Sequence, residues 1–184
     1  MLSPEKTKIV SIEQGFDFLN QYLRKFRNKL IITPSKENIK SFLDKVRKEI
    51  KACRGLKCET MIRTLNPKIR GWCNCHRSIH ASQAFSVADG VVFYSLWRWC
   101  KRRHPGKSAK WIKKKYFDSS TRKWMFSCTI KDKKGNRILF ELLRASHTQL
   151  VRYHKIKGKS NPYDPEYRDY FKMRRQLSNV SPIR

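Results

Sequence analysis

The stretch that decides the fold runs from residue 66 to residue 117 and reads NPKIRGWCNCHRSIHASQAFSVADGVVFYSLWRWCKRRHPGKSAKWIKKKYF. Its apolar residues recur every three or four positions, which is the spacing of helices that bury one face. The two series are Ile69, Trp72, Cys73, His76 and Ile79, then Phe85, Ala88, Val92, Leu96 and Trp99. The stretch therefore predicts packed helices.

The same region carries charge of almost one sign. Between Thr60 and Phe117 there are 13 Lys and Arg residues and one acid, Asp89. The whole chain of 184 residues has a formal net charge of +29 and an isoelectric point of about 10.3. A folded surface with this excess needs a polyanion to neutralise it. Four tryptophans in the stretch favour RNA as that polyanion: Trp72, Trp97, Trp99 and Trp111.

The region before this stretch predicts a small antiparallel β piece followed by a helix. Strand composition is found at Thr7, Ile9 and Ile12, at Phe16, Phe18 and Leu19, and at residues 29–33 after an Arg27-Asn28 turn. Ser35 is the expected N-cap of a helix that ends at Gly55, with a buried face of Ile39, Phe42, Leu43, Val46 and Ile50. Because a small β piece is marginally stable alone, we expect it to pack on another element or to be the edge of a larger sheet.

The remaining elements make the expected fold class α+β and mainly α. Further helices are predicted at 59–65, at 67–80 with Asn66 as cap, at 82–103 with Ser82 as cap, and at 109–116 with Ser108 as cap. A β-hairpin is predicted from residues 124–130 and 137–142, with a turn at 132–136. The basic tail predicts a turn at 161–165 and a helix at 166–177.

The expected binding surface is built from the cations of the opening stretch. From Arg98 to Lys115 there are nine Lys and Arg residues and no acid, whereas solvated helix faces normally mix both signs. Trp97 is expected to stack on an unpaired base, because Lys101 lies one turn away. The predicted RNA-binding residues are Lys68, Arg70, Arg77, Trp97, Arg98, Lys101, Arg102, Arg103, Lys107, Lys110, Lys113, Lys114 and Lys115.

We expect neither a metal site, nor another cofactor, nor a catalytic centre. Cys73, Cys75, His76 and His80 have zinc-binding side chains, but Cys73 and Cys75 point about 200° apart on a helix and no Cys-x-x-Cys pair occurs. The acids are dispersed, and no phosphate loop or nucleophile elbow is present. The six cysteines suit free thiols in a reducing compartment, cytoplasmic in a bacterium or inside an organelle. No apolar run of about 20 residues suggests a membrane partner.

Several motifs resemble one family. Leu65-Asn66-Pro67-Lys68-Ile69-Arg70-Gly71-Trp72, Leu96-Trp97-Arg98-Trp99, Arg102-Arg103-His104-Pro105 and Lys110-Trp111-Ile112 are similar to the maturase-specific domain, or thumb, of group II intron reverse transcriptases. Residues 2–9 and 15–19 resemble the end of that family's reverse-transcriptase domain, and residues 154–158 and 161–166 resemble the segment that precedes its HNH endonuclease.

The resemblance implies a thumb-like helical bundle at 34–118, preceded by the end of a reverse-transcriptase domain at 1–33 and followed by the hairpin and basic tail at 119–184. It implies binding of group II intron RNA and assistance to splicing. The Tyr-Xaa-Asp-Asp polymerase motif and the HNH motif are both absent from this sequence, so we expect no polymerase or endonuclease activity. One alternative is a C-terminal subunit that completes a split RNA-directed DNA polymerase, with an N-terminal reverse-transcriptase polypeptide as partner. Another is a generic basic nucleic-acid-binding protein, whose partner would be some other structured RNA.

Overall fold

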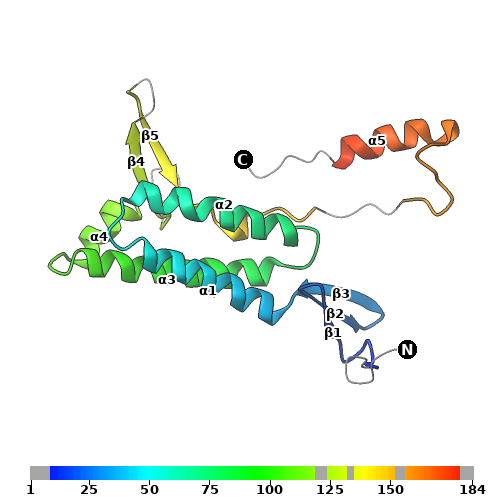
Figure 1. Cartoon of the computed structure of the whole chain (residues 1–184), viewed down its shortest axis with the longest axis horizontal. Helices are drawn as coiled ribbons and strands as arrows, with labels where there is room; N and C mark the ends of the chain where they lie inside the picture. Colours follow the sequence, from blue (N-terminus) through cyan, green and yellow to red (C-terminus); the bar gives the residue numbers. More distant parts are fainter. Residues whose placement is uncertain (1–8, 119–123, 132–134, 152–155, 179–184) are drawn as a thin grey trace.

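Three long helices lie side by side and form the body of the protein (Figure 1). The computed structural model describes residues 9–118, 124–131, 135–151 and 156–178. The long helices are α1 (Lys36–Ala52), α2 (Cys58–His76) and α3 (Ser82–Arg103), and the shorter α4 (Ala109–Tyr116) crosses one end of them. The α+β, mainly α fold class is confirmed.

Helix α1 forms where its sequence predicts it. The Ser35 side chain accepts a hydrogen bond from the backbone N–H of Asn38 at 3.1 Å, which satisfies one of the free donors of the first turn. The buried side chains of α1 are those of the predicted apolar face: Phe42, Leu43, Val46 and Ile50. The helix ends at Ala52, and the turn that follows contains Gly55.

The prediction of two separate helices at 59–65 and 67–80 is wrong, because the structure has the single helix α2 in this region. It runs without interruption through Pro67 and ends at His76. The reason is its continuous buried face, which crosses the proline from Leu65 to Ile69. Asn66 does not cap a helix, because its side chain bonds the backbone beyond the second hairpin: Nδ2 donates to the Glu141 carbonyl at 3.1 Å, and Oδ1 accepts from the Leu143 N–H at 2.8 Å.

Helices α3 and α4 have the predicted ranges, with one correction. The N-cap of α3 is Ala81 and makes no side-chain hydrogen bond, so the prediction of Ser82 as cap is wrong. The Phe85 N–H instead bonds the Ala81 carbonyl at 2.8 Å, which makes Ser82 the first helical residue. In α4 the predicted cap is confirmed, since Ser108 Oγ accepts from the Trp111 N–H at 3.3 Å.

The core contains the apolar residues that the sequence predicts for it. Ile69, Trp72, Val92, Leu96 and Trp99 are all buried. The Trp72 and Phe42 rings stack at 4.2 Å between α1 and α2. Both indole N–H groups are satisfied: Trp72 Nε1 donates to Asn38 Oδ1 at 2.8 Å, and Trp99 Nε1 donates to the Cys53 carbonyl at 3.0 Å.

A three-stranded antiparallel sheet precedes α1. Its strands are β1 (Phe16–Phe18), β2 (Gln21–Phe26) and β3 (Lys29–Pro34), in the order β1-β2-β3. The Arg27-Asn28 turn is confirmed, with φ values of 45° and 60° that suit a tight hairpin. The predicted strand positions at Ile9 and Ile12 are wrong, because residues 12–14 form a turn in which the N–H groups of Gln14 and Gly15 share the Ser11 carbonyl.

The predicted strand position at Leu19 is also wrong. The predicted strand position at Thr7 lies outside the described residues. Leu19 and Asn20 form the turn between β1 and β2, with φ values of 48° and 66°. Gly15, just before β1, has a φ of +80°, and a Cβ atom there would collide with the Tyr22 side chain and lie 2.9 Å from the Leu23 carbonyl oxygen. Glycine is therefore required at this position.

The second hairpin joins the helical core at its base. It consists of β4 (Ser127–Lys131) and β5 (Arg137–Glu141), paired in register from Ser127 with Glu141 to Lys131 with Arg137. Part of its predicted turn, residues 132–134, lies outside the described residues. The Phe126 ring stacks on Tyr116 at 5.9 Å, and Phe126, Leu142 and Ala145 are buried in the same core as the helices.

Of the last described elements, one packs on the helices and two lie away from them. The short 3-10 helix η1 (Ala145–His147) packs on α3, whereas η2 (Pro165–Tyr167) and α5 (Arg168–Ser178) stand apart from the bundle in Figure 1. The predicted tail helix is thus present, beginning two residues later than expected. None of the helices in the described ranges is long and apolar enough to cross a membrane.

Candidate nucleic-acid interface

A basic groove lies between the C-terminal part of α1 and α3, and we call it the α1–α3 groove. Its cavity has a volume of about 730 Å³. The floor is formed by Ile50, Ser95 and Trp99, all of them buried. The walls carry six cations and no acid: Arg47, Lys51 and Arg54 from α1 and the turn after it, and Arg98, Arg102 and Arg103 from α3.

Two of the groove arginines are held in place by defined contacts. Arg103 Nη1 donates to the Leu56 carbonyl at 2.6 Å, and its guanidinium carbon lies 5.1 Å from the centre of the Trp99 ring. Arg47 Nη1 lies 2.8 Å from Asp44 Oδ1. A planar guanidinium positioned in advance loses less entropy when it binds a phosphate. The groove therefore presents a partly ordered row of phosphate-binding groups.

A second group of cations lies on tryptophan rings around α4. Lys115 Nζ is 4.7 Å and Lys107 Nζ is 5.7 Å from the centre of the Trp111 ring. Within the described part of the chain, no Lys or Arg from residue 98 to residue 115 forms an ion pair with an acid. These ammonium groups are therefore available to an anion. Lys110 and Lys114 are exposed on the same short helix.

The positive field acts on His104 at the junction between α3 and α4. Its Nε2 lies 2.8 Å from the Tyr116 hydroxyl oxygen. Burial lowers the pKa of His104, and the neighbouring cations Lys115, Arg103 and Lys107 lower it further. His104 is consequently a neutral hydrogen-bonding partner at pH 7 and adds no charge to the surface.

The predicted binding residues on α2 lie elsewhere. Lys68 forms an ion pair with Glu49 across the contact between α1 and α2. Arg70 and Arg77 are half-buried, and the Arg77 carbonyl accepts from the Val151 N–H at 2.9 Å. The structure therefore gathers Arg98, Lys101, Arg102, Arg103 and the α4 lysines at one end of the bundle and leaves the three α2 residues outside that group.

Trp97 is half-buried in an aromatic cluster. Its ring centre lies 6.1 Å from Phe93, 5.4 Å from Phe117 and 6.1 Å from Trp124, and Lys101 Nζ lies 6.0 Å from it. The adjacent Trp99 faces the core, as expected from a separation of about 200° on a helix. Base stacking on Trp97 stays a prediction.

The cations that α1 contributes to the groove are not among the binding residues predicted from the sequence. Arg47, Lys51 and Arg54 are spaced by four and three residues, so they share one face. That spacing could have revealed them, although Asp44 and Glu49 dilute the charge of the segment. Only the packing of α1 on α3 shows that this face adjoins the Arg98 face.

The cysteines are free thiols with different exposure. Cys73 is buried and Cys75 is exposed, so the two side chains of this near pair lie on opposite faces of α2. Burial raises the pKa of Cys73 to about 11 and that of Cys100 to about 12, which keeps both thiols protonated at neutral pH. The described residues contain no group of three or more His, Cys, Asp and Glu side chains arranged to hold a metal ion.

Comparison with known families identifies one region of the chain. A family model described as the group II intron, maturase-specific domain matches residues 39–117, which contain most of α1 and all of α2, α3 and α4. The α1–α3 groove lies wholly inside the matched region. No curated protein matches the chain.

Proposed function

We propose that the chain binds group II intron RNA and assists the folding and splicing of that RNA, starting from the match of residues 39–117 to the group II intron, maturase-specific domain. The observation that supports the proposal is the α1–α3 groove, in which six cations and no acid surround a buried floor. A phosphodiester backbone is the polyanion that fits a row of such groups.

Binding through the groove would depend strongly on salt. Each phosphate neutralised releases condensed counterions, so the logarithm of affinity falls with the logarithm of salt by about 0.9 per contact on a duplex. Arg47 already pairs with Asp44, so the five other groove cations would set a slope of up to about −4.5 if each met one phosphate. The α4 lysines would add to this slope where the RNA extends past the groove.

The test compares two pairs of substitutions on the same helix and the turn that follows it. Lys51→Gln with Arg54→Gln removes two groove cations, whereas Lys45→Gln with Lys48→Gln removes two exposed cations that line a separate cavity of α1. Fluorescence anisotropy of a labelled group II intron RNA would be measured from 50 to 300 mM KCl. We expect the first pair to reduce the salt slope by about 2 and the second to leave it unchanged.

An equal loss from both pairs would contradict the groove as the binding site. Binding of unrelated structured RNA with the same affinity would support the alternative of a generic basic nucleic-acid-binding protein. Splicing of the intron RNA, followed with and without the protein, tests assistance separately from binding. A groove variant that still promotes splicing at the wild-type rate would contradict the proposed role of the groove.

The proposal includes no chemical step by the protein. The maturase-specific domain is a non-catalytic domain of its family. The thiols of Cys73 and Cys100 are protonated at neutral pH, and the cations of the groove have no general base among them. The protein would act by holding RNA in a productive conformation.

A second candidate function is completion of a split RNA-directed DNA polymerase. The observation in its favour is the set of exposed apolar side chains on the two faces of the first sheet and in its β1–β2 turn, where Phe18 is 59%, Leu19 77%, Phe26 47% and Leu30 51% exposed. β1 is also an edge strand, with backbone groups available for pairing. Such a surface suits a protein partner, and the expected one is a polypeptide that carries the reverse-transcriptase domain.

Co-purification tests this second candidate. The chain would be co-expressed with a reverse-transcriptase polypeptide from the same genome, as wild type, as Phe18→Ser with Phe26→Ser, and as a control with Leu56→Ser and Val87→Ser. The control residues are exposed apolar side chains of the helical region, at 45% and 50%. Loss of the partner from the sheet variant alone would support the candidate, and a monomeric wild-type chain that retains no partner would contradict it.

A further inference from the structure

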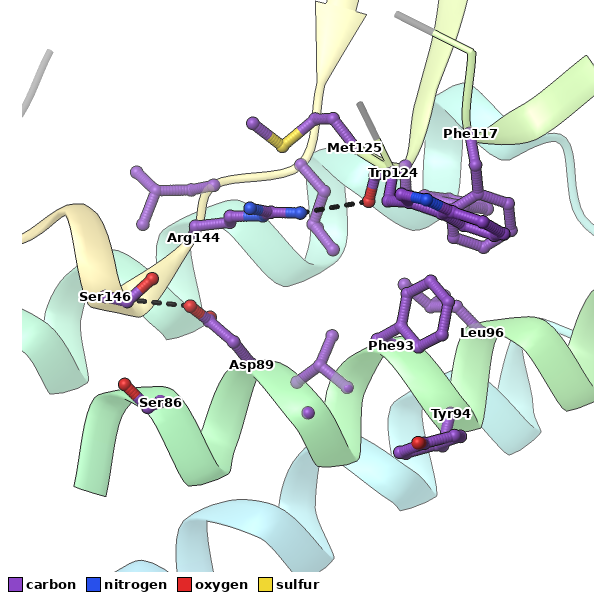
Figure 2. Close-up of a pocket in the computed structure, with 15 residues that line it drawn as sticks. Ser86, Asp89, Phe93, Tyr94, Leu96, Phe117, Trp124, Met125, Arg144 and Ser146 are labelled. Carbon is purple, nitrogen blue, oxygen red and sulfur yellow. Dashed lines mark hydrogen bonds between the residues drawn. The ribbon is translucent and has the colours of Figure 1, made fainter. Parts of the chain in front are cut away.

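A pocket with aromatic walls lies on the α3 side opposite the groove, and we call it the aromatic pocket (Figure 2). Its cavity has a volume of about 350 Å³. Phe93 rises from α3 toward Phe117 and Trp124, and Arg144 and Asp89 lie at its other side. The volume is at the lower end of the range of about 300–1,000 Å³ for ligand pockets, so the pocket suits one small planar group.

Trp124 adopts a backbone conformation that bulky residues rarely adopt. Its φ is +62°, and it is the one non-glycine residue outside the first sheet with a positive φ among those described. Arg144 Nη2 donates to the Trp124 carbonyl at 3.1 Å, and this hydrogen bond is drawn in Figure 2. Strained backbone conformations concentrate at ligand-binding sites, where the surrounding structure holds them. The indole is 42% exposed and stands at the rim of the pocket.

Gly90 leaves open space at the pocket wall. It lies in the middle of α3, where glycine is an unfavourable helix former. A Cβ atom at Gly90 would meet no heavy atom within 4 Å, so the absence of a side chain is not required by packing. The glycine therefore leaves the pocket wider at this point than a residue with a side chain would.

Two cations beside the aromatic pocket favour a ligand that carries an anionic group next to the part that enters it. Lys113 Nζ lies 4.4 Å from the centre of the Trp124 ring, and the Arg144 guanidinium is part of the lining. The acid of the lining, Asp89, is engaged by the backbone N–H groups of Ala145 at 2.8 Å and Ser146 at 3.0 Å. Asp89 thus anchors the start of η1, which explains the single acid in the basic stretch.

We propose that the aromatic pocket receives one unpaired nucleobase of the bound RNA, which stacks against Trp124 while Lys113 and Arg144 contact the adjacent phosphates. This inference rests on the proposed RNA binding and adds a site for a single-stranded feature to a groove that tracks the backbone. Aromatic faces stack on any base, and flanking cations bind the phosphates on either side. A protein segment would satisfy the aromatic walls, but it would satisfy the cations at the rim only if it carried acidic residues there.

The experiment uses three versions of one RNA stem-loop. One has a single bulged 2-aminopurine, the second has an abasic site at the bulge, and the third is fully paired. For the wild-type chain we expect quenching of 2-aminopurine on binding, and an affinity for the bulged RNA that exceeds that for the abasic RNA by roughly 5- to 150-fold, as for one stacked base.

Two variants and two matched controls locate the base. Trp124→Ala removes the stacking face, and Gly90→Leu fills the pocket with a residue that favours helix more than glycine does. Trp111→Ala removes an indole of the α4 surface, and Gly71→Leu makes the same change at an open position of α2. We expect the ratio between bulged and abasic RNA to fall to about 1 in the first two variants and to persist in the controls.

The outcomes separate the pocket from the groove. Equal affinity of the wild-type chain for bulged and abasic RNA, or an unchanged ratio in Gly90→Leu, would overturn the pocket as a base site. Neither result would affect the groove proposal, whose own test is the salt slope of the Lys51→Gln and Arg54→Gln variant. Loss of 2-aminopurine quenching in Gly90→Leu with retained binding of paired RNA would support both.

Discussion

Replacement of Asn66 by alanine tests how the second hairpin is attached to the helices. The Asn66 side chain donates to the Glu141 carbonyl at 3.1 Å and accepts from the Leu143 N–H at 2.8 Å. Loss of a hydrogen bond to a partly buried group costs about 1–3 kcal/mol when the group is not resolvated. For two bonds we expect a decrease of about 2–4 kcal/mol in the free energy of unfolding.

A matched control separates this cost from helix propensity. Asn74 is exposed on the same helix, so Asn74→Ala gains the same propensity, about 0.5 kcal/mol, and loses no hydrogen bond to the hairpin. Urea unfolding followed by circular dichroism and tryptophan fluorescence would compare the two variants. With a slope of about 2 kcal/mol/M, Asn66→Ala should lower the midpoint by about 1–2 M. A difference between the variants below about 0.5 kcal/mol would refute the reasoning that these two bonds hold the hairpin to α2.

Three further predictions concern a buried histidine, a glycine and the thiols. Burial lowers the pKa of His76 below its ordinary 6.5, so the unfolded chain takes up the proton first and stability should fall as pH decreases below about 6.5. His76→Gln should reduce this dependence in urea titrations at pH 7.5 and 5.5, leaving the part that comes from His104, whose pKa is also lowered. Gly15→Ala should destabilise the first sheet, because its Cβ would collide with the Tyr22 hydroxyl at a φ of +80°; faster proteolysis of residues 9–34 in the variant checks this, and wild-type resistance would contradict it. At pH 8 iodoacetamide should modify the exposed Cys75 rapidly and the buried Cys100, whose pKa is raised to about 12, only after unfolding; peptide mass spectrometry distinguishes the two orders of labelling.

The sequence predicts the helices well where the local signals agree. In α1 the Ser35 cap and the apolar spacing both point to one element, and the structure has it. At Asn66 and Pro67 the local signals favour a helix start, but the buried face from Leu65 to Ile69 continues across the proline and determines the outcome. Local signals are decisive only where tertiary packing does not oppose them.

The candidate interface is less predictable than the fold. The basic run from Arg98 to Lys115 is evident from composition, whereas the α1 wall of the groove depends on how α1 packs on α3. The aromatic pocket depends on contacts between α3 and residues that follow α4, which are distant in sequence. Spacing along one helix gives a face, and only the packed structure shows which two faces meet.

The packing of Phe126, Leu142 and Ala145 into the helical core has a practical consequence for shortening the chain. The family match ends at residue 117, but the Phe126 ring that stacks on Tyr116 comes from the sequence beyond it. A version truncated at that point would expose apolar surface that is buried in the whole chain. It would then tend to self-associate, and this could be mistaken for a natural dimer. The portion worth expressing by itself extends at least to Val151, whose backbone ties the end of this segment back to the second long helix.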